Sequence, residues 1–73
     1  MSLGEMIATL RRESGMTQQA LGDLLRVHRT TVARWEAGEV VLGRAALAAL
    51  CEATRPTMRE RAQLAELYTW GED

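Results

Sequence analysis

The side chains best suited to recognising another molecule gather in one short segment of the chain. Arg29, Thr30 and Arg34 fall on one side of a helix, whereas Val32 and Trp35, three residues apart, form its apolar face. An arginine guanidinium can donate two hydrogen bonds to one guanine, and a threonine can contact the methyl group of thymine. This chemistry favours the reading of DNA bases, and ordinary solvent-exposed charge is the alternative explanation.

Two short helices joined by a tight connector are expected to position these side chains. The apolar spacing predicts helices over residues 18–25 and 29–37, with Thr17 as the N-cap of the first and a connector at 26–28. A helix fits the major groove of DNA, which is about 12 Å wide. A helix-turn-helix presents its second helix to base edges in that groove, so residues of about 17–38 are predicted to form one.

Helical spacing continues through the rest of the chain, and no strand pattern is present. Further helices are expected over residues 3–14, 44–53 and 56–69, which gives five short helices in one all-α domain spanning residues 1–73. The side chains expected to form the core are Leu3, Met6, Ile7, Leu10, Ala20, Leu21, Leu24, Leu25, Val32, Trp35, Leu47, Leu50, Cys51 and Met58.

Composition argues against several classes of protein. The chain has 73 residues, 47% of them hydrophobic, and a formal net charge of −1. Its single His excludes a multi-histidine metal site, and its single Cys excludes an internal disulfide. The sequence contains no glycine-rich phosphate loop and no acidic residues spaced as paired carboxylates, so no motif indicates an enzyme or a cofactor. No apolar run approaches the roughly 20 residues of a membrane span, and residues 1–10 lack the pattern of a signal peptide. A cytoplasmic, non-enzymatic domain without metal or cofactor is expected.

Charge is distributed unevenly along the chain. All nine basic residues are arginines. Residues 1–44 carry six arginines and five acidic residues, a net of +1, whereas residues 45–73 carry three and five, a net of −2. An anionic partner would therefore meet the first part of the chain. A GC-rich genome is the other explanation for the use of arginine alone.

Four stretches of the chain stand together in one recognisable register: Leu10-Arg11, Gly15-Met16-Thr17-Gln18-Gln19-Ala20-Leu21, Val27-His28-Arg29-Thr30-Thr31-Val32-Ala33-Arg34-Trp35-Glu36 and Gly38. In these residues the chain resembles the Cro/CI-type, lambda-repressor-like (XRE) helix-turn-helix family over about residues 3–54. The resemblance implies a compact five-helix domain that binds double-stranded DNA in a sequence-specific manner. It also implies a bacterial or phage transcriptional repressor that reads a palindromic operator as a homodimer and associates with the nucleoid.

The same resemblance implies roles for individual residues. Arg11 and Glu36 would form a structural ion pair rather than contact DNA. Phosphates would be bound near helix starts, because a helix N-terminus attracts anions. The residues expected to contact bases are Arg29, Thr30, Ala33 and Arg34. The candidates for phosphate contact are Gln18, which can also support the second helix, Gly43 and Arg44, and further Arg12, Arg26 and His28.

Four positions depart from the family pattern. Arg26 stands in the turn where the family has Gly, and a left-handed conformation is disfavoured for a residue with a Cβ. Gly22 replaces an Ala and indicates close packing against another helix. His28 replaces a Ser or Thr N-cap, and its neutral imidazole can either accept one N–H or contact a phosphate. The segment 39–42 lacks the basic residues that the family usually has there. It carries Glu39, whose negative charge would be unfavourable near a phosphate, so modest affinity for DNA is expected.

The last predicted helix carries two apolar stripes, of which a small domain needs only one. We expect one stripe to close the core, and it consists of Met58, Ala62, Ala65 and Thr69. The other stripe is expected to form a homodimer interface, where tyrosine and tryptophan are favoured, and consists of Leu64, Leu67, Tyr68 and Trp70. The alternative is a helix that simply caps the bundle.

Other functions share this fold. An antitoxin that represses its own operon and blocks a toxin, or the controller of a restriction-modification system, would use the same DNA-binding chemistry. A protein-interaction module without DNA binding is the alternative from another class. That module is favoured by the net charge of −1, by Glu39 and by the apolar end of the last helix. The two outward arginines of the second motif helix, Arg29 and Arg34, argue against it.

Overall fold

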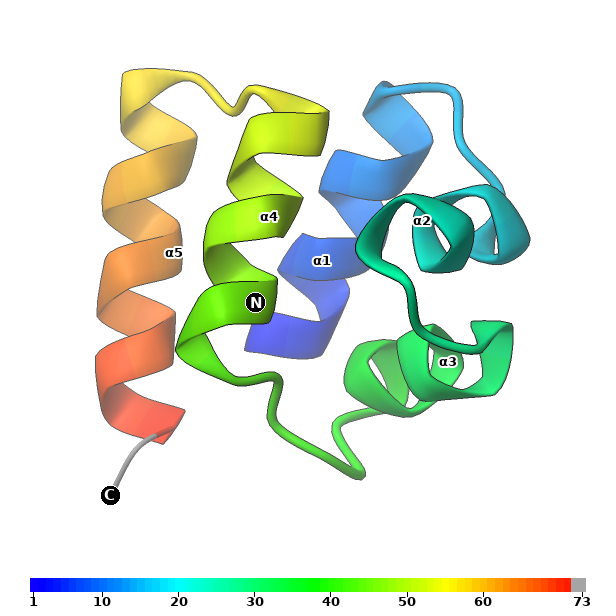
Figure 1. Cartoon of the computed structure of the whole chain (residues 1–73). Helices are drawn as coiled ribbons and strands as arrows, with labels where there is room; N and C mark the ends of the chain where they lie inside the picture. Colours follow the sequence, from blue (N-terminus) through cyan, green and yellow to red (C-terminus); the bar gives the residue numbers. More distant parts are fainter. Residues whose placement is uncertain (72–73) are drawn as a thin grey trace.

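The computed structural model of the chain describes residues 1–71, with side chains through Tyr68, and this part consists of five helices without strands (Figure 1). The predicted all-α class is therefore confirmed. Helices α2 and α3 lie together on one side of the molecule and α5 lies on the opposite side, with α1 and α4 between them (Figure 1). The helices are α1 (Leu3–Glu13), α2 (Gln18–Leu25), α3 (Arg29–Ala37), α4 (Arg44–Thr54) and α5 (Met58–Gly71).

Side-chain caps set the starts of the first two helices. At α1, Ser2 and Glu5 form a capping box: the Ser2 hydroxyl accepts from the Glu5 amide at 3.1 Å, and the Glu5 carboxylate accepts from the Ser2 amide at 2.9 Å. At α2, the hydroxyl of Thr17 accepts from the Ala20 amide at 3.0 Å, as an N-cap does. The bounds predicted for α2 and α3 are confirmed, and the predicted N-cap at Thr17 is present.

Helix α5 begins at Met58, so the start predicted at residue 56 is wrong by two residues. The reason is a second capping box. The Thr57 amide donates to the Glu60 carboxylate at 2.8 Å, and the Glu60 amide donates to the Thr57 hydroxyl at 3.1 Å. Pro56 lies before this box, buried in the connector from α4.

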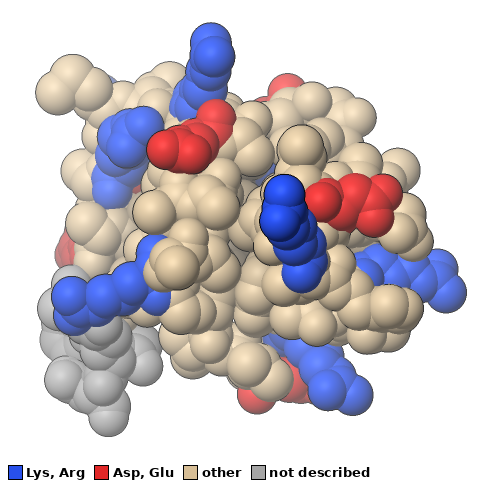
Figure 2. Space-filling model, in the orientation of Figure 1, with Lys and Arg blue, Asp and Glu red and all other residues tan. Residues whose placement is uncertain are grey.

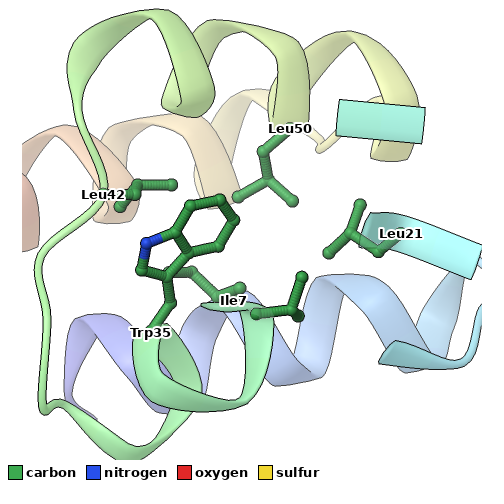
Figure 3. Close-up of a cluster of buried hydrophobic side chains, with 6 residues drawn as sticks. Ile7, Leu21, Trp35, Leu42 and Leu50 are labelled. Atoms are coloured by element: carbon green, nitrogen blue, oxygen red, sulfur yellow. The ribbon is translucent and has the colours of Figure 1, made fainter. Parts of the chain in front are cut away.

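Two clusters of buried side chains hold the helices together. In the main cluster, Trp35 is 5% exposed and its ring lies among side chains from other helices (Figure 3). The members of this cluster are Ile7, Leu21, Val32, Trp35, Leu42 and Leu50. The second cluster joins α1 to α5 and consists of Met6, Leu10 and Leu64. The prediction that Trp35 fills the space between α1, α2 and α4 is confirmed.

The homodimer interface predicted on α5 is wrong for Leu64, whereas the part of Leu67 and Tyr68 in such an interface stays a prediction. Leu64 is only 2% exposed, and Leu67 and Tyr68 are half-buried against the two core clusters. Leucine and tyrosine side chains remove more apolar surface from water than the alanines of the other stripe, which explains why this face turns inward. Trp70, the fourth predicted interface residue, lies outside the described side chains.

Four further positions differ from the core expected from the sequence. Met58, on the stripe expected to close the core, is 88% exposed, and Leu24 on α2 is 62% exposed. Leu42 was not among the expected core residues, but it is only 2% exposed and belongs to the main core cluster although it lies in the loop after α3. Cys51 is half-buried beside the second cluster rather than fully buried.

The described residues offer neither a membrane-spanning helix nor a cluster of metal ligands. No helix within residues 1–71 is both long and apolar enough to cross a membrane. In the same part of the chain, no three His, Cys, Asp or Glu side chains gather closely enough to hold a metal ion.

Candidate nucleic-acid interface

The turn between α2 and α3 is tight because Gly22 has no side chain. A Cβ at residue 22 would lie 2.7 Å from the carbonyl oxygen of Val27, while the Val27 amide donates to the Gly22 carbonyl at 2.9 Å. Arg26 takes the left-handed conformation that ends α2, with φ 59° and ψ 42°. The close approach expected at Gly22 is present, but its neighbour is the backbone of the turn rather than another helix.

His28 begins α3 by capping it. Its Nδ1 accepts the backbone N–H of Thr30 at 3.2 Å and lies 2.8 Å from the Thr30 hydroxyl oxygen. Because Nδ1 serves as an acceptor, the proton of a neutral imidazole resides on Nε2. The Nε2–H group is then a donor at the N-terminus of α3, on a side chain that is exposed to solvent.

The outer face of α3 carries the side chains predicted to contact bases. Arg29, Thr30 and Arg34 are exposed, and Ala33 is half-buried. On the inner face Val32 has no exposed surface, which fixes the rotation of the helix about its axis. The exposure of this face meets the requirement for base contact, and the contact itself stays a prediction.

The far end of α3 is held by an ion pair with α1. Nε of Arg11 lies 2.6 Å from Oε2 of Glu36, and Nη2 lies 3.1 Å from Oε1, in a bidentate contact. The side chains of the pair are only 12% and 10% exposed. Arg11 also donates to the Met16 carbonyl at 2.9 Å, and the Gln18 amide donates to Oε1 of Glu36 at 3.0 Å. This network links α1, the start of α2 and the end of α3.

Hydrogen bonding sets the ionisation of this pair. Burial alone would raise the pKa of Glu36, but the hydrogen bonds from Arg11 and Gln18 outweigh burial and hold the pKa of Glu36 below its usual 4.5. The same hydrogen bond from the other side raises the pKa of Arg11. Both groups are therefore charged at neutral pH. Gln18, predicted to contact phosphate or to support α3, has the supporting role in this structure, and its phosphate contact stays a prediction.

The start of α4 has an open backbone. Gly43 is the N-cap of α4 without a side-chain cap, and its φ of −75° is accessible to any residue. A Cβ placed there would meet no atom within 4 Å. Nothing within the described part of the chain therefore requires glycine at this position, which leaves room for another molecule to approach. Arg44 follows it and is exposed.

The remaining candidates do not form a continuous basic surface. Arg12 and Arg26 are exposed, as is Glu39 in the loop after α3. Figure 2 shows arginines separated by acidic and uncharged side chains on the face in view, some of them over the region of α2 and α3. Attraction of a polyanion would therefore depend on a few placed contacts rather than on a broad positive field.

Comparison with known proteins agrees with this geometry. A family model described as a helix-turn-helix domain matches residues 2–67. The chain belongs to this family. No curated protein and no solved structure matches the chain. The family match is consistent with the resemblance to the Cro/CI-type family.

As a helix-turn-helix domain, the chain uses α2 and α3 as the two helices of the motif, and membership indicates binding to DNA. Two residues that support the motif escaped the sequence analysis. Leu42 lies in the loop between α3 and α4, and its burial was not expected. Tyr68 was assigned to a dimer interface, yet its hydroxyl donates to the Leu42 carbonyl at 3.1 Å.

Proposed function

We propose that this helix-turn-helix domain binds double-stranded DNA in a sequence-specific manner and acts as a transcriptional repressor without catalytic activity. The observation that carries this proposal is the exposed face of Arg29, Thr30 and Arg34 on a helix whose opposite face is buried and whose end is clamped by Arg11 and Glu36. A rigidly held helix with outward guanidinium groups suits bidentate contact with guanine, and each such pair discriminates by about 1–3 kcal/mol.

The phosphate contacts of this proposal flank the base-reading helix. Gly43 would allow close approach of the DNA backbone, and Arg44 would supply charge at the start of α4. Arg12, Arg26 and the Nε2–H of His28 would add further contacts, all from exposed side chains. Glu39 opposes binding in the same region, so we expect modest affinity.

We propose that two copies read a palindromic operator in the cytoplasm, with their α3 helices about 34 Å apart on one face of the duplex. Because Leu64 is buried in the core, only the half-buried Leu67 and Tyr68 remain of the described α5 residues expected at this dimer interface. Further support comes from the small size of the domain, whose limited core gains from a partner.

A protein-interaction module with this fold is the second candidate. It is favoured by two exposed valines, Val40 at 46% and Val41 at 52%, which follow Glu39 in the loop after α3. A toxin bound by an antitoxin would be one such partner, and DNA binding and partner binding would then coexist. A restriction-modification controller would use the DNA-binding chemistry alone.

Titration of a fluorescent duplex of random sequence tests the DNA-binding proposal. We expect the folded protein to bind at low salt, with the logarithm of the affinity falling linearly with the logarithm of the salt concentration. Arg44→Ala should reduce that slope by about one. Arg59→Ala, on the exposed surface of α5, is the matched control and should leave the slope unchanged.

Gly43→Ser provides a second arm of this experiment. Serine is a better N-cap than glycine, so the variant should be at least as stable as the parent. Its side chain would occupy the space that the DNA backbone needs, and binding should weaken. Absence of any binding by the folded parent protein at low salt would shift the assignment to the protein-interaction module.

A further inference from the structure

Helix α5 reaches the loop that follows the motif through one side chain. The Tyr68 hydroxyl donates to the Leu42 carbonyl at 3.1 Å, across 26 positions of the sequence. The Tyr68 ring packs against the main core cluster, to which the Leu42 side chain itself belongs. Residue 42 is therefore held twice, through its side chain in the core and through its carbonyl by α5.

The held residue lies at a position that matters for the proposed DNA contacts. Leu42 comes directly before Gly43, the N-cap of α4, and the Gly43 carbonyl accepts the first helical hydrogen bond of α4, from Leu47 at 2.9 Å. The orientation of the peptide between residues 42 and 43 sets the direction of the Gly43 N–H. The neighbouring Val40 and Val41 are exposed, so the core holds this loop at Leu42 and not at the two valines.

We propose that Tyr68 is a positioning residue for DNA binding, which fixes the Leu42 carbonyl and thereby the phosphate-contacting backbone at Gly43 and Arg44. This inference rests on the proposed function. It gives α5 a role within its own chain. The free protein then carries the turn at residues 42–44 in the conformation that DNA needs, and binding does not have to order it.

Tyr68→Phe is the variant that tests the inference, because it keeps the ring in the core and removes only the hydroxyl. We expect it to weaken binding to every duplex alike, by about threefold to tenfold, which is the range that corresponds to one hydrogen bond. Preference among base sequences should not change, because α3 is not touched. Leu64→Met is the matched control: it perturbs the packing of α5 while conserving volume and leaving the hydroxyl in place, and should bind as the parent does.

A double-mutant cycle with Gly43→Ser separates positioning from a general structural effect, because this variant blocks the approach of DNA to the backbone at residues 43–44. If Tyr68 acts through that backbone, the effect of Tyr68→Phe on binding should largely disappear in the Gly43→Ser background. Hydrogen exchange of the Leu47 amide, which donates to the Gly43 carbonyl at 2.9 Å, should be faster in Tyr68→Phe than in the parent, with or without DNA.

Three outcomes would overturn the inference. Parent-like binding by Tyr68→Phe would remove the positioning role while leaving the proposed function intact. Full additivity in the cycle would show that the tyrosine acts elsewhere. Failure of the parent protein itself to bind any duplex would reject the proposed function, and the inference with it.

Discussion

A Cβ atom at Gly4 in α1 would lie only 2.6 Å from the carbonyl oxygen of Trp35 in α3. The first turn of α1 therefore rests directly on the backbone of α3, the helix proposed to read bases. The main-chain atoms on both sides leave no flexible side chain that can move aside, so residue 4 must be glycine for this packing to exist.

We expect Gly4→Ala to destabilise the fold by about 2 kcal/mol or more, because the added methyl group overpacks two backbones and displaces α3. Chemical denaturation measures the loss. Gly43→Ser is the control, since its added side chain begins in open space. Equal stability of Gly4→Ala and the parent would contradict the contact between α1 and α3.

The ion pair of Arg11 and Glu36 predicts a pH dependence of stability. The folded-state pKa of Glu36 lies below its ordinary 4.5, so the ionised carboxylate stabilises the fold above that pH. This contribution is lost as the pH falls through the folded-state pKa. The pKa of Glu13 is raised, mainly by its hydrogen bond with Glu60, so the contribution of Glu13 to stability changes with pH in the opposite direction. The contribution of Glu36 is therefore isolated by comparing the parent with a variant at residue 36.

The free energy of unfolding of the parent and of Glu36→Gln should accordingly converge as the pH is lowered from about 7 to about 3. At neutral pH, Arg11→Met should cost about 3 kcal/mol, because it leaves the Glu36 carboxylate largely buried without its counter-charge. A constant difference between parent and Glu36→Gln across this pH range would contradict the assigned ionisation.

The cap at His28 can be separated from any contact of His28 with phosphate. His28→Ala should lower stability by about 1 kcal/mol, because the Thr30 amide loses its acceptor, whereas His28→Ser should retain most of it. Thermal unfolding measures both. If His28 also contacts phosphate, both variants should weaken DNA binding, and parent-like binding by His28→Ser would assign the residue to capping alone.

Two arginines adopt left-handed backbone conformations, Arg26 with φ 59° and Arg55 with φ 47°. Replacement of each by glycine should stabilise the fold by about 0.5–1 kcal/mol, because glycine adopts this conformation without a Cβ clash. Arg26→Gly should nevertheless weaken DNA binding, whereas Arg55→Gly should not. Lower melting temperatures for both variants would contradict the strain at these positions.

The motif was predictable because its local signals agree with its packing. Thr17 and His28 both act as caps where the sequence places them, and α2 and α3 have the predicted bounds. The spacing of Val32 and Trp35 defines a single buried face, which leaves only one side of α3 for contact with DNA. In this segment, local chemistry and tertiary structure require the same arrangement.

The rest of the chain was less predictable because local patterns do not specify a partner surface. Helix α5 has two apolar stripes, and the packing of Leu64 against Met6 and Leu10 of α1 accompanies the outward position of Met58. The burial of Leu42 depends on a cluster of side chains from α1, α2, α3 and α4, which no spacing within the loop encodes. These features need the tertiary structure, and so does the contact between Tyr68 and Leu42.

Selection of random duplexes by the purified protein, followed by sequencing, tests the central claim most directly when the parent and Arg34→Ala are run in parallel at moderate salt. We predict an enriched palindrome for the parent, with half-sites about one helical turn apart, and relaxed preference at one position of each half-site for Arg34→Ala. An enriched single half-site would retain DNA binding and remove the dimer. No enriched sequence from folded parent protein, or an identical preference in Arg34→Ala, would contradict base reading by the outer face of α3.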